Sequence, residues 1–382
     1  MIVTLWRRTE HRRRVHSNVL RSSLTFGAAC AITIVLAIPL DAATPVAHQS
    51  TPTTLFGVGV ARCTFVDHSR SLLSYSTVPF RVRSTSRTLV TEIRYPTLSV
   101  VGGPAEAVGA PPVARSGGYP MIVFAHGYDV TPDTYAPLLD AWVRAGFVVV
   151  APFFPDENAS AVAAQPHANT EDDLANEPAD LAYVTRSVLS ASAVETSNCP
   201  AAIGLVEPTE IALAGHSDGA VAAGMLAYDH GVDPQGINFA NLRSGIDFRA
   251  VIILSGAEET TQSYATEATR PDLLVVQSRL DQCNPFRDGV QLYDNIHQSN
   301  KWFLQLQTAH HLPPFDGVDK SAFSVASSTT LRFLQMSLED VSPSPSLLAL
   351  GNQRPAIARM YSGVNGPALE NAPKVKENCG PN

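Results

Sequence analysis

A serine flanked by two glycines stands near the middle of the chain, in the pattern Gly-His-Ser-Asp-Gly at positions 215–219. The apolar run "EIALAG" leads into it and a run of small residues follows, which is typical of a sharp turn between a strand and a helix. Such a turn exposes its serine on a strained backbone, and side chains at the glycine positions would collide with it. A polar turn without a chemical role is the alternative. The context favours Ser217 as a catalytic nucleophile.

A serine nucleophile needs a general base, and the base needs an acid that orients it. The segment "PDLLVVQSRLDQCNP" places Asp281 just after an apolar strand, and Glu258 follows the preceding strand as the second candidate acid. The segment "KWFLQLQTAHHLPPF" places His310 and His311 after the last strand. The order serine, acid, histidine, each after a later strand, is that of a Ser-Asp-His triad. An extended backbone turns adjacent side chains apart, so only one of the two histidines can serve as base.

Two backbone N–H groups are candidates for stabilising an oxyanion. The N–H of Asp218 opens the helix after the serine, where the helix N-terminus favours negative charge. The N–H of Tyr128 follows the turn in "MIVFAHGY", although an ordinary tight turn is the alternative for that segment. We predict an oxyanion hole formed by these two groups. His126 and His216 are interpreted as hydrogen-bonding supports.

Apolar runs alternate with helical stretches through most of the chain. This alternation predicts an α/β fold with a mostly parallel central sheet, helices on both faces and a single domain. Polar residues indicate a surface loop over 159–178, and Gly and Pro indicate a flexible loop over 100–118. Strands are expected at 88–96, 120–127, 146–155, 210–215, 248–256, 271–278 and 301–308.

The N-terminal segment differs from the rest. Several arginines precede the apolar run 24–40, which is the layout of a secretory signal peptide; an uncleaved membrane anchor is the alternative. We therefore assign 1–47 to a signal peptide or N-terminal anchor, 48–340 to the catalytic domain and 341–382 to a C-terminal extension that reads as an extended tail. Both alternatives place the globular part outside the cytoplasm, secreted or membrane-anchored.

Charge and cysteine content narrow the classes of partner. The net charge is −8 although the leader is basic, so the rest of the chain is strongly acidic, which argues against nucleic acid as a partner. Cys30 lies in the leader, which leaves four further cysteines: Cys63, Cys199, Cys283 and Cys379. An even number of cysteines suits an oxidising compartment, and four allow three disulfide pairings. Cys379 is a candidate to hold the tail against the domain. No Cys-x-x-Cys spacing and no complete Gly-rich phosphate loop occurs, so we expect no metal and no cofactor.

The motifs together resemble a known superfamily. The serine turn, "HGY", "LDQCNP" and "HHLPP" resemble the α/β-hydrolases over about residues 55–335. Residues 57–96 are similar to the N-terminal part of the proteins in one branch of this superfamily. That branch includes bacterial proteins related to platelet-activating-factor acetylhydrolase, dienelactone hydrolases and polyester-hydrolysing cutinases. The resemblance implies the triad Ser217, Asp281 and His311 and an oxyanion hole at Tyr128 and Asp218. Asp218 departs from the apolar residue usual in polyester hydrolases, and the cysteine nucleophile of dienelactone hydrolases has no counterpart at 217.

These observations predict an exported serine hydrolase that cleaves small or polymeric carboxylic esters through an acyl-enzyme on Ser217. Acyl transfer to an acceptor other than water, by the same triad, is the first alternative. A non-catalytic binding module on a hydrolase fold is the second, and it is disfavoured because every catalytic position is filled. Dehalogenation would require a carboxylate at position 217.

Overall fold

The fold was analysed in a computed structural model. The leader 1–47, which we interpret as a signal peptide or a membrane anchor, lies outside the described residues. The structure describes residues 55–74, 81–98, 105–193, 199–232, 236–258, 271–339, 341, 344–369, 375 and 379.

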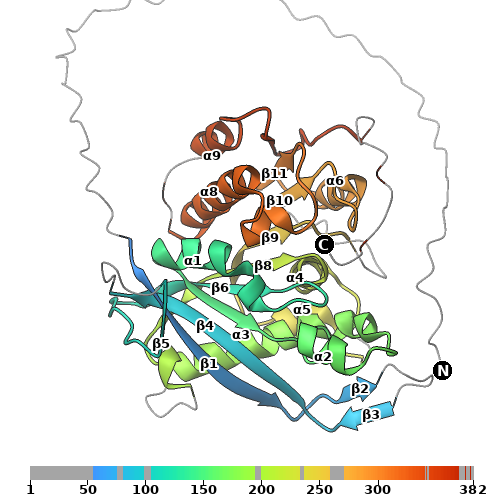
Figure 1. Ribbon diagram of the computed structural model, residues 1–382. Coiled ribbons are helices and arrows are strands. Elements are labelled where there is room, and N and C mark those ends of the chain that lie inside the picture. The colour runs from blue at the N-terminus through green and yellow to red at the C-terminus, as the bar shows by residue number, and fades with distance from the viewer. Residues whose placement is uncertain are drawn as a thin grey trace, which may run out of the picture. The chain divides into compact units, whose positions relative to one another are not determined.

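The framework of these residues is a large, mostly parallel sheet (Figure 1). The six strands from β7 to β11 in sheet order run parallel, whereas β4, β1 and β12 add antiparallel edges. The central strands β6 and β7 are buried throughout, which explains their unbroken apolar sequences. In sheet order the strands are β12 (Ala358–Ser362), β11 (Lys301–Leu306), β10 (Asp272–Ser278), β9 (Phe248–Leu254), β8 (Val206–His216), β6 (Tyr119–Ala125), β7 (Val148–Pro152), β4 (Arg87–Thr97), β1 (Gly57–Asp67) and β5 (Glu106–Val108). A small hairpin, β2 (Leu72–Ser74) with β3 (Arg81–Ser84), stands apart.

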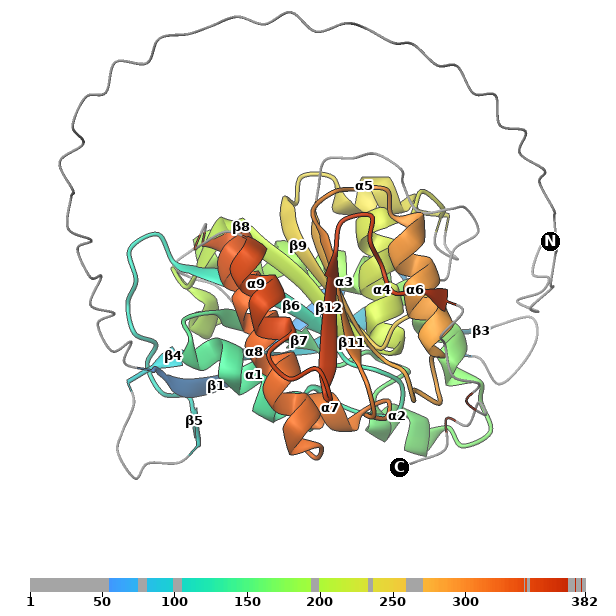
Figure 2. The same cartoon turned by 90° about the horizontal axis from the view of Figure 1, so that it is seen from above.

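Helices cover both faces of the sheet, and each face has its own apolar core (Figure 2). One core packs α3, α4 and α6 against the sheet, and the other packs α1, α8 and α9 against the opposite face. This arrangement confirms the predicted single-domain α/β-hydrolase architecture. The helices are η1 (Pro132–Tyr135), α1 (Ala136–Arg144), α2 (Ala159–Ala164), η2 (Thr170–Asn176), α3 (Glu177–Ala193), η3 (Pro200–Ala202), α4 (Asp218–Tyr228), α5 (Phe239–Arg243), α6 (Phe286–Asn295), α7 (Pro313–Asp316), α8 (Lys320–Leu338) and α9 (Ser344–Gly351).

All seven strands expected from the sequence are present, but three other segments differ from expectation. The supposed surface loop 159–178 contains α2, η2 and the start of α3, and two of its acidic residues, Asp173 and Glu177, are buried. The supposed tail includes α9 and the edge strand β12, because Leu347, Ala358 and Met360 pack into the apolar core. The Gly- and Pro-rich segment 100–118 includes the short edge strand β5.

Two disulfides select one of the three pairings open to the four cysteines. Cys63 in β1 pairs with Cys199 beyond α3, with Cα atoms 5.4 Å apart. Cys283, after β10, pairs with Cys379 near the end of the chain, with Cα atoms 4.7 Å apart. Two such pairs suit a protein of an oxidising compartment. Within the described part of the chain, no helix has the length and apolar character needed to cross a bilayer.

Candidate active site

Ser217 lies at the turn between β8 and α4, with φ 55° and ψ −123°. A non-glycine residue with such a positive φ is strained, and strain of this kind concentrates at functional sites. A Cβ atom at Gly215 would lie 2.2 Å from the carbonyl oxygen of Gly219, and one at Gly219 would lie 2.4 Å from that of Ala125. The two glycines are therefore required by close backbone packing. The Ser217 N–H donates to the Leu254 carbonyl at 3.0 Å and ties the turn to the end of β9.

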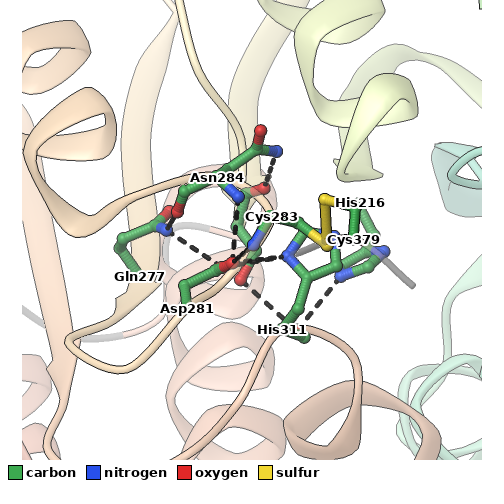
Figure 3. Close-up of a disulfide and its surroundings, with 8 residues drawn as sticks. His216, Gln277, Asp281, Cys283, Asn284, His311 and Cys379 are labelled. Carbon is green, nitrogen blue, oxygen red and sulfur yellow. Dashed lines mark hydrogen bonds and ion pairs between the residues drawn. A yellow bond between two sulfur atoms is a disulfide. The ribbon is translucent and has the colours of Figure 1, made fainter. Parts of the chain in front are cut away.

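Asp281 and His311 are brought together at the ends of β10 and β11 (Figure 3). The Nδ1 atom of His311 lies 2.9 Å from both carboxylate oxygens of the fully buried Asp281. The same carboxylate accepts the N–H groups of Cys283 at 2.9 Å and Asn284 at 3.0 Å and the amide of Gln277 at 3.1 Å. Because an ionised carboxylate only accepts, Nδ1 of His311 carries the hydrogen and Nε2 of the neutral ring keeps its lone pair.

The alternative residues lie elsewhere. His310 is exposed and its ring contacts Gln282 at 3.4 Å. The side chain of Glu258 accepts a hydrogen bond from Asn295 at the end of α6. The structure thus groups Asp281 with His311 rather than with His310, and gives Glu258 a different partner.

His311 also contacts the serine turn through His216. Their ring centroids lie 4.6 Å apart, and Nε2 of His216 lies 3.2 Å from the His311 carbonyl oxygen. The loop that carries the candidate base is therefore held directly against the residue that precedes Ser217.

The loop after β6 carries the candidate oxyanion donor Tyr128, and the buried ring of His126 determines the geometry of this loop. Nε2 of His126 accepts the Phe154 N–H at 3.1 Å, so the hydrogen of the neutral ring is on Nδ1, which donates to the Gly127 carbonyl at 2.8 Å. Burial lowers the pKa of His126 to about 4, which keeps the ring neutral. In a trans peptide the C=O and the next N–H point in opposite directions, so the bond to Gly127 also sets the direction of the Tyr128 N–H.

The same loop approaches the serine closely. A Cβ atom at Gly127 would lie 2.9 Å from Cβ of Ser217, so only glycine fits without a shift. The side chain of Tyr128 is partly buried, and its hydroxyl lies 3.1 Å from the Thr170 hydroxyl in η2. Asp218, the other candidate donor, is the first residue of α4, where backbone N–H groups lack intrahelical acceptors.

A buried charge network stands behind this loop, and the sequence analysis missed it. Arg87 of β4 is fully buried and donates to the carboxylates of Asp173 and Asp180 at 2.6–3.0 Å. Arg70 bonds the Asp180 carboxylate from the other side at 2.5 Å. These pairs anchor η2 and the start of α3 against the sheet. Arg87 lies just before the expected strand 88–96, and no local pattern in the sequence marks it as buried.

Two further carboxyl groups, Glu157 and Glu177, face each other in the interior next to this network. Burial, followed by nearby carboxylates, raises the pKa of both well above the ordinary value of 4.5. The backbone carbonyl of Glu157 accepts the Asp129 N–H at 2.9 Å, one residue beyond Tyr128. Across the described ranges, no group of histidine, cysteine and acidic side chains has a geometry suited to a metal ion.

Comparisons with known proteins agree with this fold. A family model described as chlorophyllase matches residues 97–278. The structure is similar to that of a ferulic acid esterase from Streptomyces cinnamoneus, with a TM-score of 0.57 and 17% sequence identity, over 78% of this chain and 94% of that one. No curated protein sequence matches the chain.

These two likenesses confirm the expected resemblance to the α/β-hydrolase superfamily of serine esterases. They indicate a carboxylic-ester hydrolase, in agreement with the sequence analysis. The branch of polyester hydrolases and acetylhydrolases stays a prediction, since the family model that matches is a different one.

Proposed function

We propose that the protein is an exported serine hydrolase that cleaves carboxylic esters through an acyl-enzyme on Ser217, with Asp281 and His311 completing the triad. The observation that carries this proposal is the strained backbone of Ser217 next to a base loop whose histidine is bonded to a buried carboxylate. The esterase family and fold support the general reaction.

In the acylation step, the Ser217 hydroxyl oxygen attacks the ester carbonyl carbon while Nε2 of His311 takes its proton. The carbonyl electron pair moves to oxygen, and the N–H groups of Tyr128 and Asp218 stabilise the resulting oxyanion. When the oxyanion collapses, the bond to the alcohol oxygen breaks and His311 returns the proton to that oxygen. Asp281 stabilises the imidazolium throughout and stays ionised.

In the deacylation step, water replaces the alcohol. His311 takes a proton from water and the hydroxide attacks the acyl carbon. When the second tetrahedral intermediate collapses, the bond to the Ser217 oxygen breaks, His311 returns the proton to that oxygen, and the free acid leaves. An alcohol in place of water would yield a new ester, and this is the acyltransferase alternative. Adding an alcohol during turnover of a nitrophenyl ester, and measuring the ratio of new ester to acid, distinguishes the two reactions.

The test of the nucleophile is Ser217→Ala. The variant loses one partly exposed hydroxyl, so we expect it to fold normally, to lose hydrolysis of short-chain nitrophenyl esters, and to resist labelling by a fluorophosphonate. The measurements are initial rates and the mass of the labelled protein. Labelling of the variant at another serine, with activity retained, would contradict the assignment.

The substrate class can be narrowed with a series of chromogenic esters of increasing acyl length, to which we add a feruloyl ester because the structural neighbour is a ferulic acid esterase. We propose an ester substrate, small or polymeric, and no nucleic acid. Export is proposed from the leader layout together with the paired cysteines. Membrane anchoring through the leader remains the alternative, and N-terminal sequencing of the protein recovered from its native host distinguishes cleavage from anchoring.

A further inference from the structure

A chain of three hydrogen bonds connects the oxyanion loop to the base loop through the interior. The Gly127 N–H lies 3.2 Å from the Tyr135 hydroxyl oxygen. That hydroxyl lies 2.8 Å from Nδ1 of His216, and Nε2 of His216 lies 3.2 Å from the His311 carbonyl oxygen. Tyr135 and His216 therefore join the backbones of two loops that lie far apart in the sequence.

The direction of every bond in this chain follows from its two ends. A carbonyl oxygen only accepts, so Nε2 of His216 carries the hydrogen and donates to His311. In the neutral ring Nδ1 is then an acceptor, and the Tyr135 hydroxyl must donate to it. The hydroxyl oxygen is left to accept the Gly127 N–H. Each donor meets an acceptor, so the three bonds are mutually consistent.

Burial stabilises this hydrogen-bond chain and keeps its two side chains, Tyr135 and His216, neutral. Tyr135 is fully buried and His216 is 2% exposed. Desolvation, followed by the charge of His311, lowers the pKa of His216 well below its ordinary value, and desolvation raises the pKa of Tyr135. The two rings pack with centroids 5.4 Å apart, and Phe124 and Phe315 close the surroundings. A neutral, satisfied polar chain in an apolar setting is costly to break.

We propose that Tyr135 and His216 are positioning residues that hold the oxyanion loop at Gly127 and the base loop at His311 in a fixed relation across the serine turn. The proposal rests on the proposed function, because it gives these two residues a role in the same reaction. Neither side chain takes part in bond making. Their effect is on the alignment of the Tyr128 N–H and the His311 ring, which must both be correct in the transition state.

The test is Tyr135→Phe, which keeps the ring and removes the hydroxyl at the centre of the chain. Tyr119→Phe is the matched control, because Tyr119 is also buried and its hydroxyl bonds a backbone carbonyl, that of Val113, at 3.0 Å. We expect Tyr135→Phe to lower kcat by about 10- to 100-fold with KM changed less than about threefold. We expect Tyr119→Phe to lower the melting temperature to a similar extent and to leave kcat unchanged. Equal kcat values for the two variants would overturn the proposal.

A second measurement uses the unaltered protein and does not depend on the folding of any variant. Nitrogen-15 NMR of the histidine rings should find His216 with its hydrogen on Nε2 and His126 with its hydrogen on Nδ1, that is, two buried neutral rings in opposite tautomers. A hydrogen on Nδ1 of His216 would leave Nε2 without a hydrogen to donate to the His311 carbonyl, which would break the hydrogen-bond chain and overturn the proposal. If the protein has the expected tautomers and yet Ser217 does not react with a fluorophosphonate, the proposed function fails while the hydrogen-bond chain stands.

Discussion

His310 and His311 are neighbours in the sequence with opposite surroundings. His311 is 8% exposed and bonded to the buried Asp281, whereas His310 is exposed beside Gln282. Both residues lie in the irregular segment between β11 and α7, and only the His311 ring reaches the Asp281 carboxylate. Replacing each histidine separately by alanine therefore distinguishes the loss of the general base from a general disturbance of the loop.

We expect His311→Ala to lower kcat/KM by roughly 10³-fold or more, because Ser217 loses its proton acceptor. His310→Ala should keep most of the activity, since the exposed ring contacts a glutamine alone among the residues the structure describes. Steady-state rates with a nitrophenyl ester, together with circular dichroism to verify folding, make the comparison. An inactive His310→Ala beside an active His311→Ala would reverse the assignment, and two active variants would remove the triad.

At the scale of elements, the segment between β7 and α3 supports the oxyanion loop from behind. Thr170 of η2 contacts the Tyr128 hydroxyl, and the Glu157 carbonyl accepts the Asp129 N–H. The segment is itself held by the buried Arg87 with its two aspartates, and it contains the buried carboxyl groups of Glu157 and Glu177. The pair faces further negative charge from Asp218, Asp173 and Asp180. The stability of this support therefore depends on the proton that the two glutamates retain.

The pH dependence of stability should report this proton. Burial raises the pKa of both glutamates in the folded state, so the stability they contribute is complete below their ordinary value of 4.5 and is lost as the pH rises toward the folded-state pKa. We expect the melting temperature to fall as the pH rises above the ordinary carboxyl value of 4.5. In Glu177→Gln the amide can donate to Glu157 without ionising, so the decline should be shallower. Thermal unfolding at a series of pH values is the measurement.

The control for this prediction is Glu207→Gln, in which a surface glutamate that bonds Thr209 is neutralised. It should keep the pH dependence of the unaltered protein. A Glu177→Gln variant with the same pH dependence as Glu207→Gln would show that Glu177 binds no more protons in the folded state than in the unfolded chain, which would contradict its raised pKa.

At the scale of the whole molecule, two disulfides join distant parts of the chain, but only one is next to the candidate site. Cys63 and Cys199 are 136 residues apart in the sequence, and Cys283 and Cys379 are 96 apart. Cys283 donates its N–H to Asp281, so the second disulfide fixes the end of the chain to the loop that carries the acid (Figure 3).

Replacing each pair of cysteines by serine should therefore have different consequences. Both double variants should lose about 2–5 kcal/mol of stability, because a cross-link across a long loop restricts the unfolded chain. Only Cys283→Ser with Cys379→Ser should also lower kcat, by loosening the Asp281 loop. Denaturant unfolding and ester hydrolysis at a temperature where both variants are folded measure the two effects. Equal activity in the two double variants would show that the second disulfide acts on stability alone.

The sequence alone determined seven of the ten strands of the main sheet and the order of the catalytic candidates. Unbroken apolar runs identify strands buried on both faces. The two glycines around Ser217 identify a sharp turn whose backbone leaves no room for a side chain at positions 215 and 219. These signals are local, because each one depends on a few consecutive residues. The family and fold comparisons confirm the superfamily that these residues indicated.

Only the tertiary structure decided which groups meet. The grouping of His311 with Asp281, the opposite environment of His310 and the disulfide partners depend on loops that fold toward one another, and no local pattern encodes that. Tyr135 shows the difference most clearly. Nothing in its sequence position distinguishes it from a core aromatic residue, yet its hydroxyl lies between Gly127 and His216. The buried Arg87 is a similar case, because a charged residue is buried only when partners from distant segments satisfy it.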